Sequence, residues 1–319
     1  MEKKLKVGQR KELTAKKKLS VRCKKEMQWY SMCAIPMLLV FVFCYIPMFG
    51  IVIAFKNYRY DLGILGSEWV GFDNFRVFLM SDDFSRITRN TIVLNAVFIS
   101  VSMICALMLA VFLFGIKRRS CVKVYQTLLI TPNFMSWVIV GYIVYAFLSP
   151  QYGFITNLYK NITGNDIDFY SRPELWPAIL TVVCVWKHVG MDSVLYYSAL
   201  MGVDSSLFEA ARIDGANRFQ EIRYIMIPQI VNLITILFIL KIGGIFRADF
   251  GLFYQTTRDV SALYPTTDVM DTYIFRVMRT LGDMQISSAA GCLQSVVGLI
   301  CVLFTNFVVK KIDPDRAMF

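Results

Sequence analysis

The sequence predicts an all-α integral membrane protein with six transmembrane helices. Hydrophobic residues make up 56% of the 319 residues and charged residues only 18%, against about 45–50% and 25% in soluble domains. The mean hydropathy is +0.52. Six apolar runs approach the ~20 residues needed to cross a bilayer: Trp29–Phe55, Thr91–Ile116, Val124–Leu148, Trp176–Val203, Gln229–Ile245 and Ile286–Val309.

The six runs differ in how purely apolar they are. The first, second, third and sixth carry no charge within their apolar stretch, whereas the fourth and fifth hold ionisable residues. A soluble protein with buried helices is the alternative, but its core helices would show a polar face. The stretch Val93–Phe114 shows almost none. The first run follows a long polar tail and lacks a small-residue cleavage site, so we expect the chain to keep it as a span.

The distribution of positive charge predicts the orientation. The tail Met1–Gln28, the loops Lys117–Lys123 and Asp204–Pro228, and the tail Lys310–Phe319 would share one side of the membrane. They hold about twice as many lysines and arginines as the segments on the other side, which places both termini in the cytoplasm by the positive-inside rule. The net charge of +11 is thereby explained by membrane topology and lipid head groups, and we expect no nucleic acid partner.

The cytoplasmic loop Asp204–Pro228 reads as two short helices joined by a glycine. Ser206 and Glu209 have the spacing of a capping box, which predicts a helix starting at Leu207. Gly215 is expected to end that helix, and a second cap at Asn217 to Gln220 to open another. Pro228 would mark the boundary with the fifth span. Taken alone, the pattern also fits an ordinary loop lying on the bilayer surface.

This loop resembles the EAA motif of permease subunits in binding-protein-dependent ABC importers, the superfamily of the maltose-type permeases. The matching residues are Glu209-Ala210-Ala211, Asp214-Gly215-Ala216 and Ile225-Met226-Ile227-Pro228. The resemblance implies a type I importer transmembrane domain whose loop is a coupling helix seated in a separate ATPase subunit. The residues it assigns to ATPase coupling are Glu209, Ala210, Ala211, Asp214, Gly215, Ala216 and Pro228.

Other segments resemble the oligosaccharide-importing branch of that superfamily, most closely permeases for fragments of acidic plant and algal polysaccharides. These are Trp186-Lys187, Tyr196–Asp204, Phe246–Gly251 and Tyr264–Tyr273. Hydropathy and charge predict a basic cytoplasmic tail (1–28), a first transmembrane helix (29–55) and a second cytoplasmic tail (311–319). The resemblance begins at about Phe75 and implies the importer domain (75–310, with the EAA loop at 204–228).

Ionisable residues within the spans mark a pathway or a packing contact. His188 and Asp192 are four residues apart, so they lie on one helical face and can pair. Two interpretations remain open for the cations: they tie helices together, or Lys187 and Lys241 line the route of an acidic sugar. Trp186, Tyr196 and Tyr197 likewise are candidates for stacking against sugar rings or for anchoring spans at the interface.

Partners and cofactors follow from the resemblance and from a missing motif. The sequence holds no G-x-x-x-x-G-K-[ST] phosphate loop, so we expect ATP and magnesium to bind a partner ATPase dimer and no cofactor, metal or covalent chemistry on this chain. A second related permease, an extracytoplasmic binding protein and an oligosaccharide complete the expected assembly. The segment Asp268–Leu281 is expected to form a short helix on the outer surface. The alternative is a secondary transporter in which His188 and Asp192 relay protons.

Overall fold

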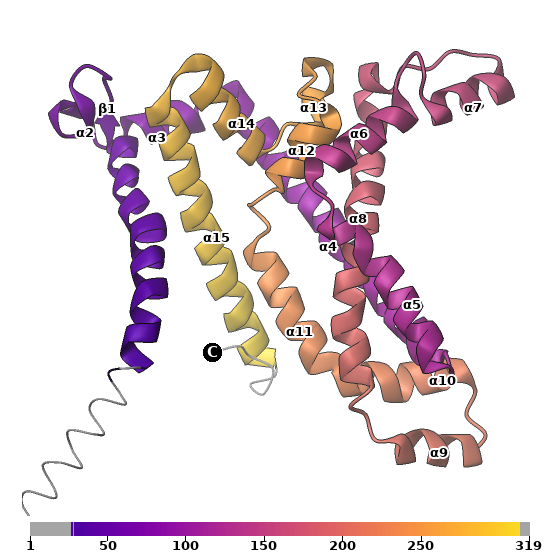
Figure 1. Ribbon diagram of the computed structural model, residues 1–319. Coiled ribbons are helices and arrows are strands. Elements are labelled where there is room, and N and C mark those ends of the chain that lie inside the picture. Colours follow the sequence, from indigo (N-terminus) through magenta and orange to yellow (C-terminus); the bar gives the residue numbers. More distant parts are fainter. Residues whose placement is uncertain (1–26, 28, 313–319) are drawn as a thin grey trace, which may run out of the picture. The chain divides into compact units, whose positions relative to one another are not determined.

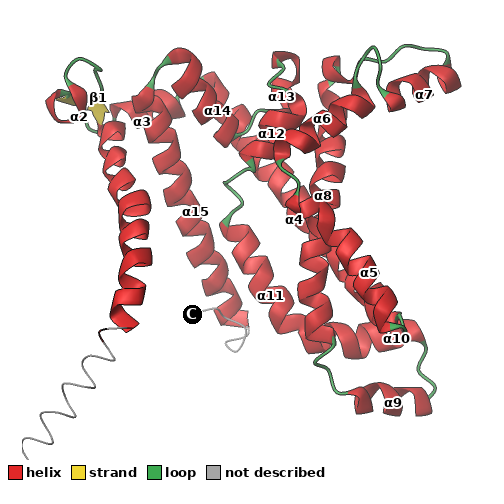
Figure 2. Cartoon of the chain, in the orientation of Figure 1, coloured by secondary structure: helices red, strands yellow, loops and turns green. Residues whose placement is uncertain are grey.

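The computed structural model describes residue 27 and residues 29–312, which are almost entirely helical (Figures 1 and 2). The chain divides into two compact units, Met1–Ile53 and Ala54–Phe319. A two-stranded antiparallel sheet pairs β1 (Lys56–Asn57) with β2 (Glu68–Trp69). The helix α2 (Gly63–Gly66) lies between the two strands in the sequence, and α3 (Asp73–Leu79) follows β2.

The helical segment Trp29–Phe55 has the bounds predicted for the first span. It contains a π-helical turn, η1 (Phe41–Tyr45), followed by a 3₁₀ stretch, η2 (Ile46–Phe55). Pro47 lies within this change of helical type, as expected for a residue without an N–H to donate. The predicted basic tail, except Met27, lies outside the described residues, as do residues 313–319. The predicted four-part division of the chain stays a prediction.

Four further apolar helices can cross a bilayer. Within the described residues they are α4 (Asp82–Gly115), α8 (Trp176–Leu200) with the 3₁₀ turn η5 (Pro173–Leu175) before it, the segment Arg218–Gly243 that ends in α11 (Ile227–Gly243), and α15 (Met284–Ile312). The second, fourth, fifth and sixth predicted spans each overlap one of these helices. At a rise of about 1.5 Å per residue, α4 extends roughly 50 Å, well beyond the hydrocarbon core.

The third predicted span is wrong as a continuous helix. The structure has α5 (Arg119–Ile130), the 3₁₀ turn η3 (Thr131–Phe134) and α6 (Trp137–Leu148), and the two halves meet at an angle of 97°. Pro132 lies in the break, and Ser136 caps α6 by accepting from the Ile139 N–H at 3.4 Å. Hydropathy registers the apolar length but not this turn, because the apolar residues continue on both sides of it.

Short helices cover one end of the second unit. After α6 come α7 (Phe154–Thr163) and η4 (Phe169–Ser171), and after α11 come α12 (Phe250–Thr257), η7 (Ser261–Leu263) and α13 (Tyr264–Thr267). The helix predicted over Asp268–Leu281 is present as α14 (Met270–Arg276) continued by η8 (Val277–Leu281). All these elements lie along the upper edge of the view in Figure 1.

The second unit holds two large clusters of buried apolar side chains, one above the other along α4 and α8. The outer cluster joins α4, α6, α8 and α12, and includes Leu94, Phe98, Val140, Trp176, Leu180, Leu252 and Phe253. The inner cluster joins α4, α8 and α11 with the loop Asp204–Pro228, and includes Ala106, Ala110, Val189, Tyr196, Phe208, Met226 and Ile230. The loop is therefore packed into the spans and does not merely connect them.

The helices α5 and α8 approach closely at Gly190. A Cβ atom placed there would overlap the carbonyl oxygen of Leu129, and backbone cannot yield as a flexible side chain can. We expect Gly190→Ala to lower the free energy of unfolding by about 1–3 kcal/mol, measured as a fall in the thermal unfolding midpoint. Gly291→Ala in α15 is the matched control, since nothing lies within 4 Å of a Cβ there. Equal midpoints for the two variants would contradict the close approach.

Candidate functional site

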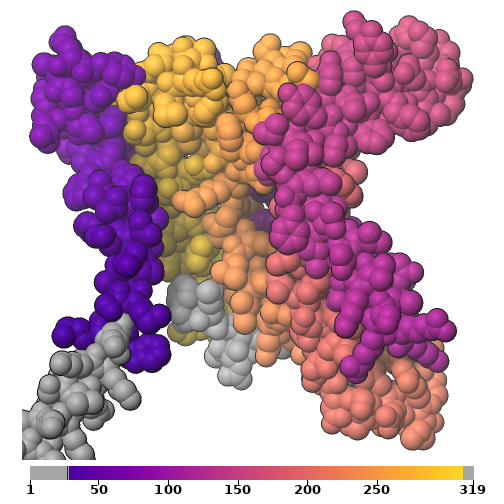
Figure 3. All heavy atoms as spheres, in the orientation of Figure 1, coloured from indigo at the N-terminus to yellow at the C-terminus, as the bar shows by residue number. Residues whose placement is uncertain are grey.

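The loop Asp204–Pro228 carries the helices α9 (Ser205–Ile213) and α10 (Arg218–Glu221) and the π turn η6 (Ile222–Met226). In the space-filling view it forms the projecting lower right corner (Figure 3). The predicted start of α9 is wrong by two residues, because Asp204 and not Ser206 is the cap. The Asp204 carboxylate accepts from the Ser206 N–H at 3.0 Å. Hydrogen bonds from Ser206 hold the pKa of Asp204 below its usual value.

The predicted break and second cap are confirmed. Gly215 has a φ of +79°, which a residue with a Cβ adopts only with strain. At this turn the Ala216 N–H donates to the Ala211 carbonyl at 2.9 Å. Asn217 and Gln220 then form a reciprocal capping box: Asn217 Oδ1 accepts from the Gln220 N–H and Gln220 Oε1 from the Asn217 N–H.

Pro228 is the second residue of α11, so the predicted boundary with the fifth span is confirmed, but the helix is not interrupted there. One helical segment runs from Arg218 to Gly243, and Pro228 lies within its α11 part. The five residues before α11 are π-helical. A wider turn there accommodates the ring and the missing N–H of a proline. The loop is consequently joined to the fifth span by continuous helix.

The motif residues present an open surface on a fixed base. Glu209, Ala210, Asp214 and Gly215 are exposed, while Ala211 and Ala216 are half-buried. On the opposite side of α9, Phe208 is only 5% exposed and its ring lies 5.4 Å from that of Phe114 at the end of α4. Apolar side chains beside the motif, such as Ile213 and Phe219, are exposed. Such a patch on a projecting helix is typical of a docking surface.

A buried carboxylate fixes the angle between α9 and α10, and the sequence reasoning missed it. The Glu221 side chain, 4% exposed, accepts from Arg212 Nε at 2.8 Å and from an Arg218 guanidinium nitrogen at 2.7 Å. Arg218 and Glu221 are three residues apart, a spacing that was visible in the sequence. Arg212 lies on the other helix, so its participation depends on the turn at Gly215.

We expect Glu221→Ala to destabilise the loop by about 2 kcal/mol, because two charge-assisted hydrogen bonds are lost and two guanidinium groups are left side by side. Both arginines are substantially exposed, so water offsets part of the cost. Faster amide hydrogen exchange in α9, with exchange in α15 unchanged, would report the effect. Unchanged exchange in α9 would show that Phe208 alone holds the helix.

A second site is the polar cavity, a hollow of about 300 Å³ within the membrane-spanning part whose wall combines polar and charged side chains with Phe98, Ile99 and Leu252. Its walls come from α4, α8, the end of α11 and the segment leading into α12. They include Asn95, Ser102, Cys184, His188, Lys241, Arg247 and Asp249. Polar and charged groups facing a cavity at bilayer depth are typical of a transport pathway.

The predicted pairing of His188 with Asp192 is replaced by two other contacts. The Asp192 carboxylate accepts from Lys241 Nζ at 2.8 Å, which joins α8 to α11. His188 Nδ1 lies 3.1 Å from Asn133 Oδ1, and its Nε2 lies 3.9 Å from an Asp249 carboxylate oxygen. The i, i+4 spacing made the predicted pair geometrically possible, but long-range partners from other helices compete for both side chains.

Asp249 lines this cavity and contacts two other elements, and the sequence analysis did not identify it as a site residue. Its carboxylate accepts from Trp137 Nε1 at 2.8 Å and caps α12 through the N–H of Gly251 at 3.0 Å. It thus ties the start of α6 to the start of α12 beside His188. Its place directly before a helical stretch was the only signal in the sequence.

The remaining candidate pathway residues lie apart from this cavity. Lys187 is buried, and its Nζ donates to the carbonyls of Pro132, Asn133 and Met135 in the break between α5 and α6. Tyr196 is buried in the inner apolar cluster, and Tyr197 packs against it. Trp186 lies on the face of α8 that borders an apolar groove. Of the predicted pathway residues, Lys241 is the one that lines the cavity.

The fold is that of a helical membrane protein with several apolar spans and a projecting α9–α10 loop, and comparison with known proteins identifies it as a permease. Residues 101–315 match the family described as binding-protein-dependent transport system inner membrane component. The chain belongs to this family.

Two relatives and a solved structure are similar over nearly the whole length. Protein LplB of Bacillus subtilis (strain 168) is 36% identical over 305 residues, 95% of each chain. The polygalacturonan/rhamnogalacturonan transport system permease protein YteP of the same strain is 33% identical over 304 residues, 94% of this chain and 93% of that one. A chain of a bacterial ABC transporter involved in the import of the acidic polysaccharide alginate matches with a TM-score of 0.82 and 31% identity, covering 93% of this chain and 99% of the other.

Proposed function

We propose that this chain is one permease half of an ATP-driven importer that admits acidic oligosaccharides by alternating access. The observation that carries the proposal is the exposed α9 surface, which bears the EAA motif on a loop packed into the inner apolar cluster through Phe208. A rigid loop that continues into α11 can transmit the movement of an ATPase to the spans. The chain itself serves transport and catalyses no reaction.

The proposed assembly contains a second related permease, an ATPase dimer that holds ATP and magnesium, and an extracytoplasmic binding protein. A bacterial alginate transporter that is 31% identical was solved with an alginate pentasaccharide-bound periplasmic protein, which supports the last of these partners. Both termini and the α9–α10 loop lie in the cytoplasm, and α7, α12, α13 and α14 lie at the outer face. The charge bias between the two sets of loops supports this orientation.

The polar cavity supports an acidic substrate. Lys241 and Arg247 line it from α11 and the following segment, beside His188. The arginine fork matches a carboxylate in two hydrogen bonds, and Lys241 is held in place by Asp192. The carboxylates of Asp192 and Asp249 keep the site from being purely cationic, so a uronate would be attracted but not trapped. The similarity to transporters of acidic polysaccharides points the same way.

Uptake into proteoliposomes that contain the whole assembly tests this function. We expect uronate oligosaccharides carried by the binding protein to accumulate only with ATP, and neutral oligosaccharides of equal length to compete weakly. A vesicle without ATP but with an imposed proton gradient is the control for secondary transport. Uptake driven by that gradient would overturn the ATP-driven function, and equal competition by neutral sugars would overturn the acidic substrate alone.

A further inference from the structure

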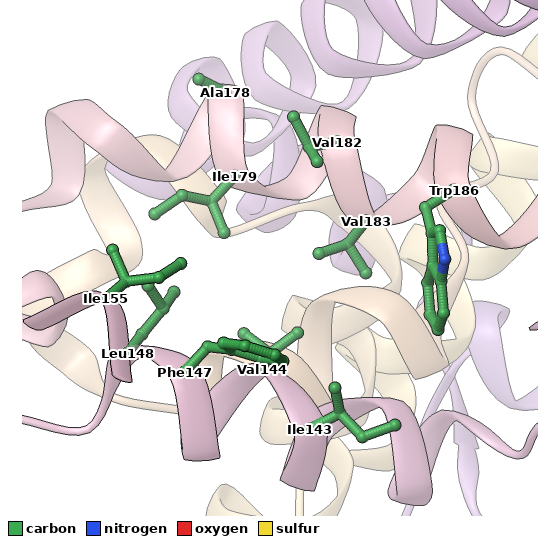
Figure 4. A pocket seen from close by; sticks show the side chains of 10 residues that line it. All are labelled: Ile143, Val144, Phe147, Leu148, Ile155, Ala178, Ile179, Val182, Val183 and Trp186. Carbon is green, nitrogen blue, oxygen red and sulfur yellow. The ribbon is translucent and has the colours of Figure 1, made fainter. Parts of the chain in front are cut away.

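An apolar groove of about 580 Å³ lies between α6, α7 and α8. Figure 4 shows side chains of α6 and α8 facing one another across it, with Trp186 at one end. Every lining side chain is apolar or aromatic: Ile143, Val144, Phe147, Leu148, Ile155, Ala178, Ile179, Val182, Val183 and Trp186. A sugar has no hydrogen-bonding partner among these side chains apart from the indole N–H of Trp186, so this groove is not part of the substrate route.

The groove lies on the face of α8 that points away from the polar cavity. Cys184 and His188 line the cavity, whereas Val182 and Trp186 line the groove. Residues two positions apart are separated by about 200° around a helix, so these pairs face opposite directions. A translocation route shared with a second permease passes on the cavity side. The groove side is thereby left facing the bilayer.

The groove has the depth of one leaflet. Its lining on α8 runs from Ala178, near the outer end of that helix, to Trp186. Eight residues at 1.5 Å each span about 12 Å, against about 15 Å for half of the hydrocarbon core. The floor of the groove is thus near the middle of the membrane, where an acyl chain from the outer leaflet ends.

The helix α7 continues the apolar surface at the outer end. Phe154, Ile155, Leu158, Tyr159 and Ile162 form one exposed stripe along it, and Ile155 also lines the groove. The polar side of α7 carries Lys160, paired with Asp166 at 2.7 Å. An amphipathic helix of this kind lies in the interface with its apolar face toward the acyl chains.

We propose that the groove between α6, α7 and α8 is a binding site for one acyl chain of an outer-leaflet phospholipid, with α7 lying in the interface above it. The inside–outside assignment comes from the proposed function. A concave groove walled by three helices buries more of a chain than the convex side of a lone helix does, so this lipid exchanges more slowly than its neighbours. The acyl chain fills the space between α6 and α8 that no side chain of the protein fills.

Photolabelling tests the site on the intact assembly in nanodiscs. The probe is phosphatidylethanolamine with a diazirine in its acyl chain, and adducts are mapped by mass spectrometry. We expect peptides of α6 and α8 that line the groove to carry several-fold more label than exposed α15 positions such as Leu299. Val182→Trp fills the groove and should remove this excess, whereas Leu299→Trp, a matched insertion on an exposed helix face, should not.

Two results would overturn the proposal. One is labelling of the groove no greater than that of α15. The other is cross-linking of groove peptides to the second permease, which would show that this subunit covers the groove and shields it from lipid. A second measurement does not depend on the groove-filling variant Val182→Trp. Brominated acyl chains should quench a component of tryptophan emission that Trp186→Phe removes; if that variant loses no quenchable emission, the chain does not reach the groove. Neither test depends on the sugar or on ATP, so the lipid site and the transport function fail separately.

Discussion

Glu209→Lys is expected to abolish the stimulation of ATP hydrolysis by the loaded binding protein, while that protein still captures its sugar. Glu209 is exposed on α9, at the position that the motif assigns to ATPase docking. Reversing one charge at a docking surface places like charges together and costs several kcal/mol of association energy. Each 1.4 kcal/mol is about a tenfold loss of affinity, so stimulated hydrolysis should fall by two orders of magnitude or more.

The matched control is Glu174→Lys, which makes the same charge change at an exposed position in η5, on the proposed outer face. It should leave stimulated hydrolysis unchanged. The loop variant should still fold, because Phe208 and Glu221, which hold α9 in place, are untouched. If an assembly with Glu209→Lys retains its ATPase and still hydrolyses ATP at the wild-type stimulated rate, the motif does not couple the two subunits.

The local features of this chain could be predicted because neighbouring residues determine them. Apolar length identified the spans, and Gly215 with the Asn217–Gln220 box set the course of the cytoplasmic loop. The start of α9 was placed wrongly because Asp204 and Ser206 are both good caps, and only the backbone geometry decides between them. Pro228 was read as a boundary, yet a π turn lets the helix continue through it.

The features that join distant segments could not be predicted. Lys241 finds Asp192 49 residues away, and Asp268 is buried between Arg86 and Arg276 in the outer part. Each of these pairs depends on how helices cross, for which a single sequence carries no signal. The break between α5 and α6 is a similar case, since the cation that contacts its carbonyls, Lys187, comes from α8.

Lys187→Met should severely reduce the amount of folded protein. The three carbonyls that Lys187 Nζ contacts, at 3.2, 3.1 and 2.5 Å, belong to the break between α5 and α6. Little water is present at bilayer depth to donate hydrogen bonds to the backbone, so each carbonyl left without a donor costs about 1–3 kcal/mol. The lysine also lies 4.9 Å from the centre of the Trp137 ring. We therefore expect a loss of at least about 3 kcal/mol, seen as a lower thermal midpoint and poor recovery from the membrane.

Lys160→Met on α7 is the control, because Lys160 is exposed and has only a surface pair to lose, worth at most about 1 kcal/mol. The measurement also separates the two interpretations of Lys187 that the sequence left open. If the lysine supports the break, Lys187→Met lowers the thermal midpoint and leaves the KM for sugar unchanged in the molecules that fold. If the lysine binds substrate, Lys187→Met raises KM at an unchanged thermal midpoint, because the carbonyl contacts of the lysine would then contribute little to stability.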